Sequence, residues 1–99
     1  MKERKIRWDK DAVRQLNEAI SYIRKESPQN ADKVKKVIIE KINELSENPE
    51  VYPPDKYKRN NNDNYRAFEV YHYRISYLVK AVEVIITRIR HTGQLPKEY

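Results

Sequence analysis

The spacing of apolar side chains changes once along this chain, and that change constrains the fold more than any other feature. Between residues 10 and 48 apolar residues recur every three or four positions, as on one face of a helix. From residue 65 onward the period falls to about two, as in strands. A segment rich in proline and asparagine separates the two parts. The sequence therefore predicts an α+β domain in which helices pack on a sheet.

Two amphipathic helices are predicted in the first half. Asp9 is a typical N-cap residue, and the first helix is expected over residues 10–26. Ser27-Pro28 ends this helix and begins the next, because serine caps helices and proline fits the first helical position. Asn48-Pro49 is expected to end the second helix. Each helix has one apolar stripe, so the two form a hairpin that faces a single core.

Four strands are predicted to complete the domain. A short strand covers residues 2–8, and three strands rich in β-branched and aromatic residues cover 65–70, 73–80 and 82–90. Their short connections favour an antiparallel meander. The order β-α-α-β-β-β gives a helical hairpin packed on one side of a mostly antiparallel four-stranded sheet. The predicted core consists of Val13, Leu16, Ile20, Ile23, Val34, Ile38, Ile42, Leu45, Phe68, Ile75, Tyr77, Ile85 and Ile89.

Length and composition exclude several classes of protein. The 99 residues suffice for one domain, residues 1–99, and eight tyrosines must supply part of its core. The absence of cysteine excludes disulfides and thiolate chemistry. Because no apolar run is long enough for a membrane span and the N-terminal residues do not resemble a signal peptide, we expect a cytoplasmic protein that does not enter a membrane.

The net charge of +6 favours an anionic partner, and the second half of the chain carries the larger share of the excess. The segment 49–64 is long for a loop within a compact domain, which favours a functional role. It places Lys56, Lys58 and Arg59 near two tyrosines, as in a binding loop. The same three cations are equally consistent with a loop that is merely well solvated.

Several motifs together resemble the RelE/ParE superfamily of toxins from type II toxin-antitoxin modules. They are ISYIRKESPQNADKV at the helical hairpin, ELSENPE at the end of the second helix, and YRAFEVYHYRISYLV leading into VIITRIRHTG. The resemblance implies a small toxin neutralised by a cognate antitoxin that wraps over the sheet and helices. It implies one of two targets, since RelE-like members cleave messenger RNA on the ribosome and ParE-like members poison DNA gyrase.

Cutting RNA without a metal requires a base, an acid and cations that stabilise the phosphorane. Arg66 matches the arginine of the family's Arg-x-Phe segment, and Arg88 and Arg90 share one face of the last strand. His91 is a candidate acid or base, and Tyr99 or Tyr73 a candidate hydroxyl or stacking surface. The predicted binding residues are Lys56, Lys58, Arg59, Arg66, Arg88 and Arg90.

Structural roles explain some of the same residues. Arg74 is interpreted as a solvated or ion-paired surface group, and His91 also fits a strand-end histidine bonded to a backbone carbonyl. The two histidines and scattered carboxylates lack metal-ligand spacing, and nothing indicates a cofactor. Because no complete nuclease set maps onto the residues, the sequence favours a ParE-like gyrase poison. The alternatives are a RelE-like ribosome-dependent nuclease and a non-toxic binding module of the same fold.

Overall fold

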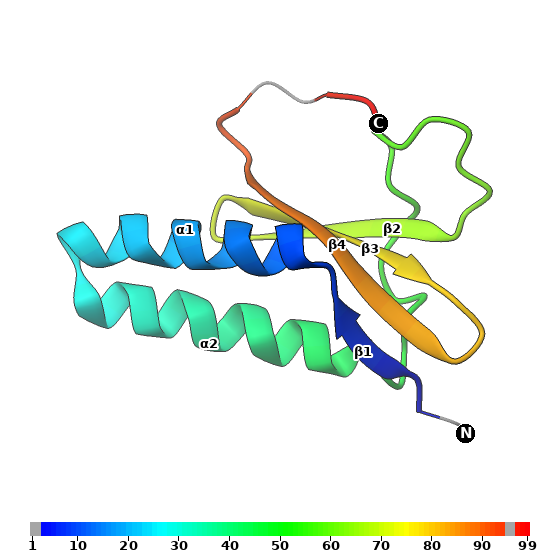
Figure 1. Cartoon of the computed structure of the whole chain (residues 1–99), viewed down its shortest axis with the longest axis horizontal. Helices are drawn as coiled ribbons and strands as arrows, with labels where there is room; N and C mark the ends of the chain where they lie inside the picture. Colours follow the sequence, from blue (N-terminus) through cyan, green and yellow to red (C-terminus); the bar gives the residue numbers. More distant parts are fainter. Residues whose placement is uncertain (1–2, 95–96) are drawn as a thin grey trace.

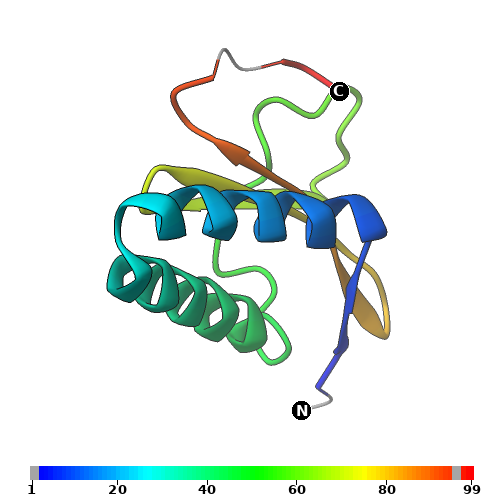
Figure 2. The same ribbon diagram turned by 60° about the vertical axis from the view of Figure 1, so that its left-hand side comes forward.

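The computed structural model describes residues 3–94 and 97–99. Figure 1 shows two helices side by side, and Figure 2 shows both of them on the same side of the sheet. In chain order the elements are β1 (Lys5–Trp8), α1 (Lys10–Glu26), α2 (Pro28–Glu44), β2 (Tyr65–Val70), β3 (Tyr73–Val79) and β4 (Glu83–His91). The predicted order and the helical hairpin on a four-stranded sheet are confirmed.

The strands lie in the order β1-β4-β3-β2. β1 runs parallel to β4, and the two remaining pairs are antiparallel, so the sheet is mostly antiparallel as predicted. Tyr71 and His72 form the turn between β2 and β3 and have φ values of 48° and 68°. Positive φ at both turn residues matches the right-handed twist of a hairpin. The predicted first strand begins only at Lys5, and residue 2 of that prediction lies outside the described part of the chain.

The turn between the helices follows the sequence prediction. The Ser27 side chain accepts a hydrogen bond from the backbone N–H of Asn30 at 3.2 Å, and proline follows it at the first helical position. The prediction that α2 continues to Asn48-Pro49 is wrong. The N–H groups of Leu45 and Ser46 bond to carbonyls three residues earlier, which tightens the last turn, and the helix ends at Glu44.

The main core lies between the helices and the facing side of the sheet. Its fully buried residues include Ile38, Ile42, Ile75 and Tyr77, all of which were predicted. Val13 was predicted there wrongly and is 41% exposed. The buried stripe of α1 consists of Ala12, Leu16 and Ile20. Val13 follows Ala12 directly, so it is rotated away from this stripe by about 100°.

A β-bulge in β4 changes which residues face the core. Ser76 is opposite Arg88 and Tyr77 is opposite Ile86, so Thr87 has no Cα partner on β3. The extra residue allows Ile86 and Ile89, three positions apart, both to join the main core. A strict period of two along β4 had instead predicted that Ile85 and Ile89 lie on the same face. Ile85 is buried, as predicted, but it lies on the other face, opposite Leu78 and outside the main core.

The segment between α2 and β2 closes the outer edge of the sheet. Pro54 forms an isolated antiparallel bridge with Arg66. The Asp55 N–H donates to the Tyr65 carbonyl at 2.8 Å. These contacts cover an edge strand that would otherwise present free backbone groups, and they fix the loop next to the sheet face that the helices leave open.

Candidate functional site: a basic face on the sheet

The sheet face turned away from the helices carries three arginines. Directly opposite residues of antiparallel strands project to the same side, so Arg88 stands beside Ser76, and Arg90 beside Arg74. The strand residues between them belong to the main core. Lys58 reaches the same region from the loop, with its Nζ 4.8 Å from the ring centre of Tyr65. We refer to Lys58, Arg74, Arg88 and Arg90 as the basic face.

The carboxylate of Asp55 organises the loop side of this basic face. Its side chain is completely buried. Oδ1 accepts hydrogen bonds from Nη2 of Arg74 at 2.8 Å and from the backbone N–H of Tyr57 at 3.1 Å. Oδ2 accepts from the hydroxyl of Ser76 at 3.1 Å and from the hydroxyl of Tyr99. Both carboxylate oxygens are therefore fully used, and the buried charge has a cationic partner.

Arg74 is held on several sides. Beside its contact with Asp55 it pairs with Glu69 at 3.0 Å, and its guanidinium carbon lies 4.8 Å from the ring centre of Tyr57. Burial disfavours its charge, but the bonds to the two carboxylates outweigh burial and raise the pKa of Arg74. The sequence interpretation of an ion-paired arginine is confirmed. The group is not a solvated one, because the side chain is only 12% exposed.

Ionisation in this cluster is fixed at neutral pH. Burial of Asp55 opposes its charge, but hydrogen bonds from Tyr99, Arg74 and the Tyr57 backbone outweigh burial and lower its pKa. Burial and the hydrogen bond to Asp55 together raise the pKa of Tyr99 to about 12. Asp55 is thus an anion and Tyr99 a neutral donor, so neither acts as a proton-transfer group near pH 7.

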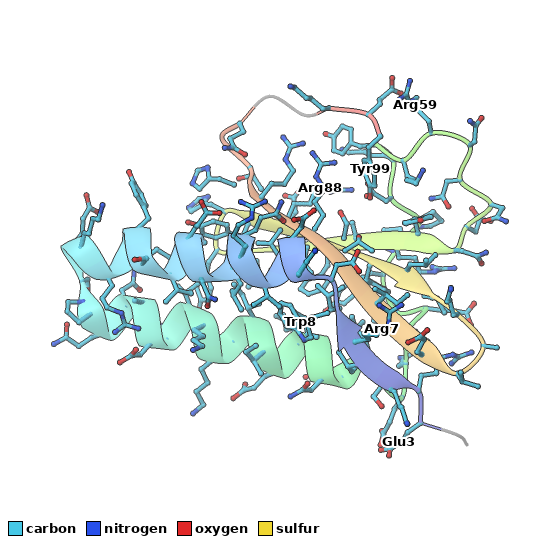
Figure 3. The ribbon with its side chains drawn as sticks, viewed as in Figure 1. Glu3, Arg7, Trp8, Arg59, Arg88 and Tyr99 are labelled. Atoms are coloured by element: carbon cyan, nitrogen blue, oxygen red, sulfur yellow. The ribbon has the colours of Figure 1, made fainter. Side chains whose placement is uncertain are left out.

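Tyr99 lies between loop and sheet with its ring against cations. The guanidinium carbon of Arg88 is 4.6 Å from the centre of that ring, and Nζ of Lys58 is 5.3 Å from it. Figure 3 shows Arg88 reaching from β4 toward Tyr99. The Tyr99 N–H donates to the Tyr57 carbonyl at 3.0 Å, and its own carbonyl accepts from the Arg59 N–H at 2.8 Å. Side chain and backbone therefore both attach this residue to the loop.

Arg66 is not part of this arrangement. It pairs with Tyr77 across the β2–β3 ladder and so projects to the side that the helices cover. Nη1 donates to the Tyr52 carbonyl at 2.6 Å, and Nη2 lies 3.8 Å from Glu50. Arg66 was predicted to form one site with Arg88 and Arg90. The structure separates Arg66 from the other two arginines. Its position in the β2–β3 register places its side chain on the opposite face of the sheet, where it bonds to the loop.

His91 and the end of β4 border an open cleft of about 690 Å³ between α1 and the sheet. Arg88 and Arg90 also line this cleft. Nδ1 of His91 accepts a hydrogen bond from the backbone N–H of Gly93 at 2.9 Å. The sequence had suggested that His91 donates to a backbone carbonyl, whereas this nitrogen accepts from a backbone donor. The ring of His91 lies edge-on to the ring of Tyr73, with 5.2 Å between the centres.

The free side of β4 adjoins the same cleft. β1 pairs with β4 only as far as Ile86, and among the described residues no strand continues along that side. The N–H of Ile89 bonds there to the side-chain oxygen of Gln15 at 2.7 Å. Alternate residues of a strand direct their backbone groups to the same side, so His91 faces this edge as well. The sheet therefore has one closed edge and one partly open edge.

The remaining loop cations have different positions. Lys56 is exposed, with Nζ 5.2 Å from the ring centre of Tyr57, and Arg59 is exposed beside the Tyr99 backbone. The sequence analysis missed Asp55 and Ser76, which join the loop to the sheet. The only local signal was an aspartate directly after Pro53-Pro54, and this does not show which strand residues it meets.

Neither a metal site nor a membrane segment was found in the described ranges, 3–94 and 97–99. They contain no group of three or more histidine and carboxylate side chains able to hold a metal ion. None of their helices is long and apolar enough to cross a membrane.

Residues 6–96 match the family described as the ParE toxin of the type II toxin-antitoxin system parDE. The chain belongs to the ParE toxin family. This confirms the resemblance to RelE/ParE toxins noted from the motifs. A search of curated protein sequences gives no significant match.

Two solved structures share the fold of this ParE family chain. One, described as the chromosomal ParDE toxin-antitoxin system from P. aeruginosa, has a TM-score of 0.69 and 20% sequence identity, and the match covers 90% of this chain and 96% of the other. The other, described as the toxin-antitoxin complex RelBE2 from Mycobacterium tuberculosis, has a TM-score of 0.61 and 20% identity, with 95% and 97% covered. Both solved structures therefore share the fold of this chain.

Proposed function

We propose that this ParE family chain is the growth-inhibiting toxin of a type II toxin-antitoxin module, acting in the cytoplasm on DNA gyrase without cutting nucleic acid. The observation that carries the non-hydrolytic part is the bonding of Tyr99 to Asp55 and of Asp55 to Arg74. Tyr99, the candidate hydroxyl, is thereby held as a hydrogen-bond donor to a carboxylate that is already ion-paired. A protein that works by holding its target requires only a charged surface of fixed shape.

The alternative of ribosome-dependent RNA cleavage needs an available base and acid. Of the predicted acid-base candidates, His91 is exposed, but its Nδ1 is bonded to Gly93 and its ring contacts Tyr73. These contacts support a role in ordering the end of the β3–β4 ladder. A non-toxic binding module would use the same basic face without inhibiting growth.

The proposed partner is a cognate antitoxin with an acidic segment. Both structural neighbours are described as toxin-antitoxin assemblies. In this chain, the basic face and the partly open edge of β4 offer positive charge beside backbone groups. An antitoxin segment would bind there as an added strand, or cross the helical hairpin as an amphipathic helix with its carboxylates against Arg88 and Arg90.

Induced expression in bacteria tests the target. A gyrase poison should stop growth and trigger a DNA-damage response while messages stay intact, and the purified protein should inhibit supercoiling by gyrase. Rapid message cleavage would instead support the nuclease, and normal growth with folded protein would support the binding module. The variant Arg88→Ala/Arg90→Ala should lose toxicity. The matched control is Arg14→Ala/Arg24→Ala, which removes two exposed arginines from α1.

Titration calorimetry with the purified antitoxin tests the contact. Replacing Arg88 or Arg90 by alanine should weaken the complex by about 2 to 5 kcal/mol if the charge pair is buried, because a lone buried charge remains. A pair at the rim of the interface should cost less than about 1 kcal/mol. Unchanged affinity in the double variant would indicate that the antitoxin binds elsewhere, on the loop or the helical hairpin.

A further inference from the structure

The ring of Tyr99 covers part of the basic face from outside. It contacts the Arg88 guanidinium and Lys58 Nζ, the two cations closest to it. Lys58 is held further by hydrogen bonds to the carbonyls of Tyr99 at 3.2 Å and Arg59 at 3.3 Å. Residues 97 and 98 are exposed, whereas Tyr99 is half-buried. The segment 97–99 is therefore anchored chiefly through its tyrosine.

The anchor is attached at three points of different kinds. The hydroxyl bonds to Asp55, the ring stacks on Arg88, and the backbone forms three hydrogen bonds with the loop. Asp55 would remain fixed without Tyr99, because Arg74, Ser76 and the Tyr57 N–H still hold it. The position of Asp55 is thus kept when Tyr99 leaves. The contact between Tyr99 and Asp55 can therefore break without disturbing the rest of the fold.

We propose that residues 97–99 form a strap that shields the basic face, and that release of Tyr99 from Asp55 exposes Arg88 and Lys58 to an acidic peptide partner. The choice of a peptide rests on the proposed function and on the neighbouring edge of β4, along which no described strand pairs beyond Ile86. There the Ile89 N–H bonds to the Gln15 side chain and the His91 carbonyl accepts from the Gln94 N–H, so a pairing chain would replace these two local bonds. An extended acidic chain would pair with this edge while its carboxylates meet the uncovered cations. In the strapped state Tyr99 competes with that chain.

Arginine modification by phenylglyoxal, followed by mass spectrometry, measures the shielding directly. In Tyr99→Ala, Arg88 should react about 3- to 10-fold faster than in the wild type, as expected for loss of a cation–π contact. The molecule contains its own controls. Arg74, still buried against Asp55, should remain slow if the face stays folded, and exposed Arg14 should react at the same rate in both proteins.

Two further variants make the result decisive. Tyr99→Phe keeps the ring but removes the hydroxyl bond to Asp55, so it should give a smaller increase at Arg88. If Tyr99→Ala loosens the fold, so that Arg74 also reacts faster, the Arg88 rate in Tyr99→Phe still tests the strap. Tyr71→Asn removes an exposed tyrosine from a turn position with positive φ, which asparagine tolerates, and should leave Arg88 unchanged. An Arg88 rate equal to the wild type in Tyr99→Phe, or in a folded Tyr99→Ala, would overturn the strap.

Fluorescence anisotropy with a labelled short polyglutamate peptide tests the occupant. Tyr99→Ala should bind it about 3- to 10-fold more tightly than the wild type, and adding Arg88→Ala should remove the gain. Equal binding by wild type and Tyr99→Ala, or a gain seen only with a short oligothymidylate of similar charge, would overturn the peptide assignment. Neither assay involves growth or gyrase, so a protein without toxicity can still have the strap, and a toxin can lack it.

Discussion

The two faces of the sheet are covered in different ways. One is covered by α1 and α2, whose apolar stripes pack on Ile75 and Tyr77 of β3 and on Ile86 and Ile89 of β4. The other is covered by a loop and residues 97–99, which are held by hydrogen bonds, ion pairs and stacked rings around Asp55. Apolar packing gains free energy from buried area and tolerates small shifts, whereas the polar cluster depends on direction and on charge state.

This difference indicates a division of labour. The helix-covered face should determine whether the chain folds, and the polar face should determine where its cations stand. The residues of the proposed site then lie outside the main apolar core, and segments that move on binding are commonly drawn from such regions. If the two faces separate in this way, five measurements should show it.

The largest expected effect is on the helix-covered face. Ile38→Ala should lower the free energy of unfolding by about 2 to 5 kcal/mol, because a fully buried side chain leaves a cavity between α2 and the sheet. Urea denaturation followed by circular dichroism measures it. Val13→Ala, at an exposed position of α1, should cost about 0.5 kcal/mol or less. Similar losses at both positions would show that the core is not where the structure places it.

The polar cluster should matter somewhat less for overall stability. Asp55→Asn removes the charge that neutralises Arg74, which is 12% exposed, and should cost about 2 to 3 kcal/mol in the same urea experiment. The control is Glu69→Gln, which removes the other partner of Arg74. Its side chain is 53% exposed, so the cost should be below about 1 kcal/mol. An equal cost for both variants would mean that burial of Asp55 contributes little.

Acid should weaken this cluster selectively. The folded-state pKa of Asp55 is lowered, so its stabilising effect is complete above the unfolded value of about 3.9 and is lost as pH falls through the folded value. The difference in unfolding free energy between wild type and Asp55→Asn should therefore shrink below about pH 4. A difference that stays constant between pH 7 and about pH 2 would contradict an ionised Asp55 as the source.

The alkaline side has the opposite sign. Because the pKa of Tyr99 is raised to about 12, its contribution is complete below the unfolded value of about 10 and is lost as pH rises toward 12. Tyr99→Phe should therefore lack this part of the alkaline loss. The same urea series, continued to high pH on both proteins, measures it. Identical alkaline profiles would mean that the Tyr99 hydroxyl does not bond to Asp55 in solution.

The sequence predicted the first face better than the second, for a physical reason. The stripes of α1 and α2 and the Ser27-Pro28 turn are local patterns, and local patterns can be read along the chain. The bulge at Thr87 cannot be predicted from a local pattern, because it depends on the register with β3. For this reason Ile85 was predicted on the wrong face of the sheet. Asp55 was missed because its partners Arg74 and Tyr99 are 19 and 44 residues away.

Arg66 shows that a correctly predicted strand does not tell which face of the sheet a side chain occupies. Its strand was predicted, and its charge made it a site candidate, but its face depended on pairing with Tyr77. The consequence is a side chain that holds the loop from the core side, through Tyr52, while Asp55 holds it from the basic side. The loop is thus fixed to both faces. Variants of its two attachments can therefore measure whether the two faces contribute independently to stability.

A double-mutant cycle between these two attachments should show the smallest effect. Arg66→Ala and Asp55→Asn each free one side of the loop, yet Arg66 and Asp55 contact different partners on opposite faces of the sheet. If the faces are independent, the coupling free energy should be below about 0.5 kcal/mol. Urea denaturation of the two single variants and the double variant provides the value. A coupling above about 1 kcal/mol would show that the loop transmits strain between the faces, and the basic face would then respond to changes in the core.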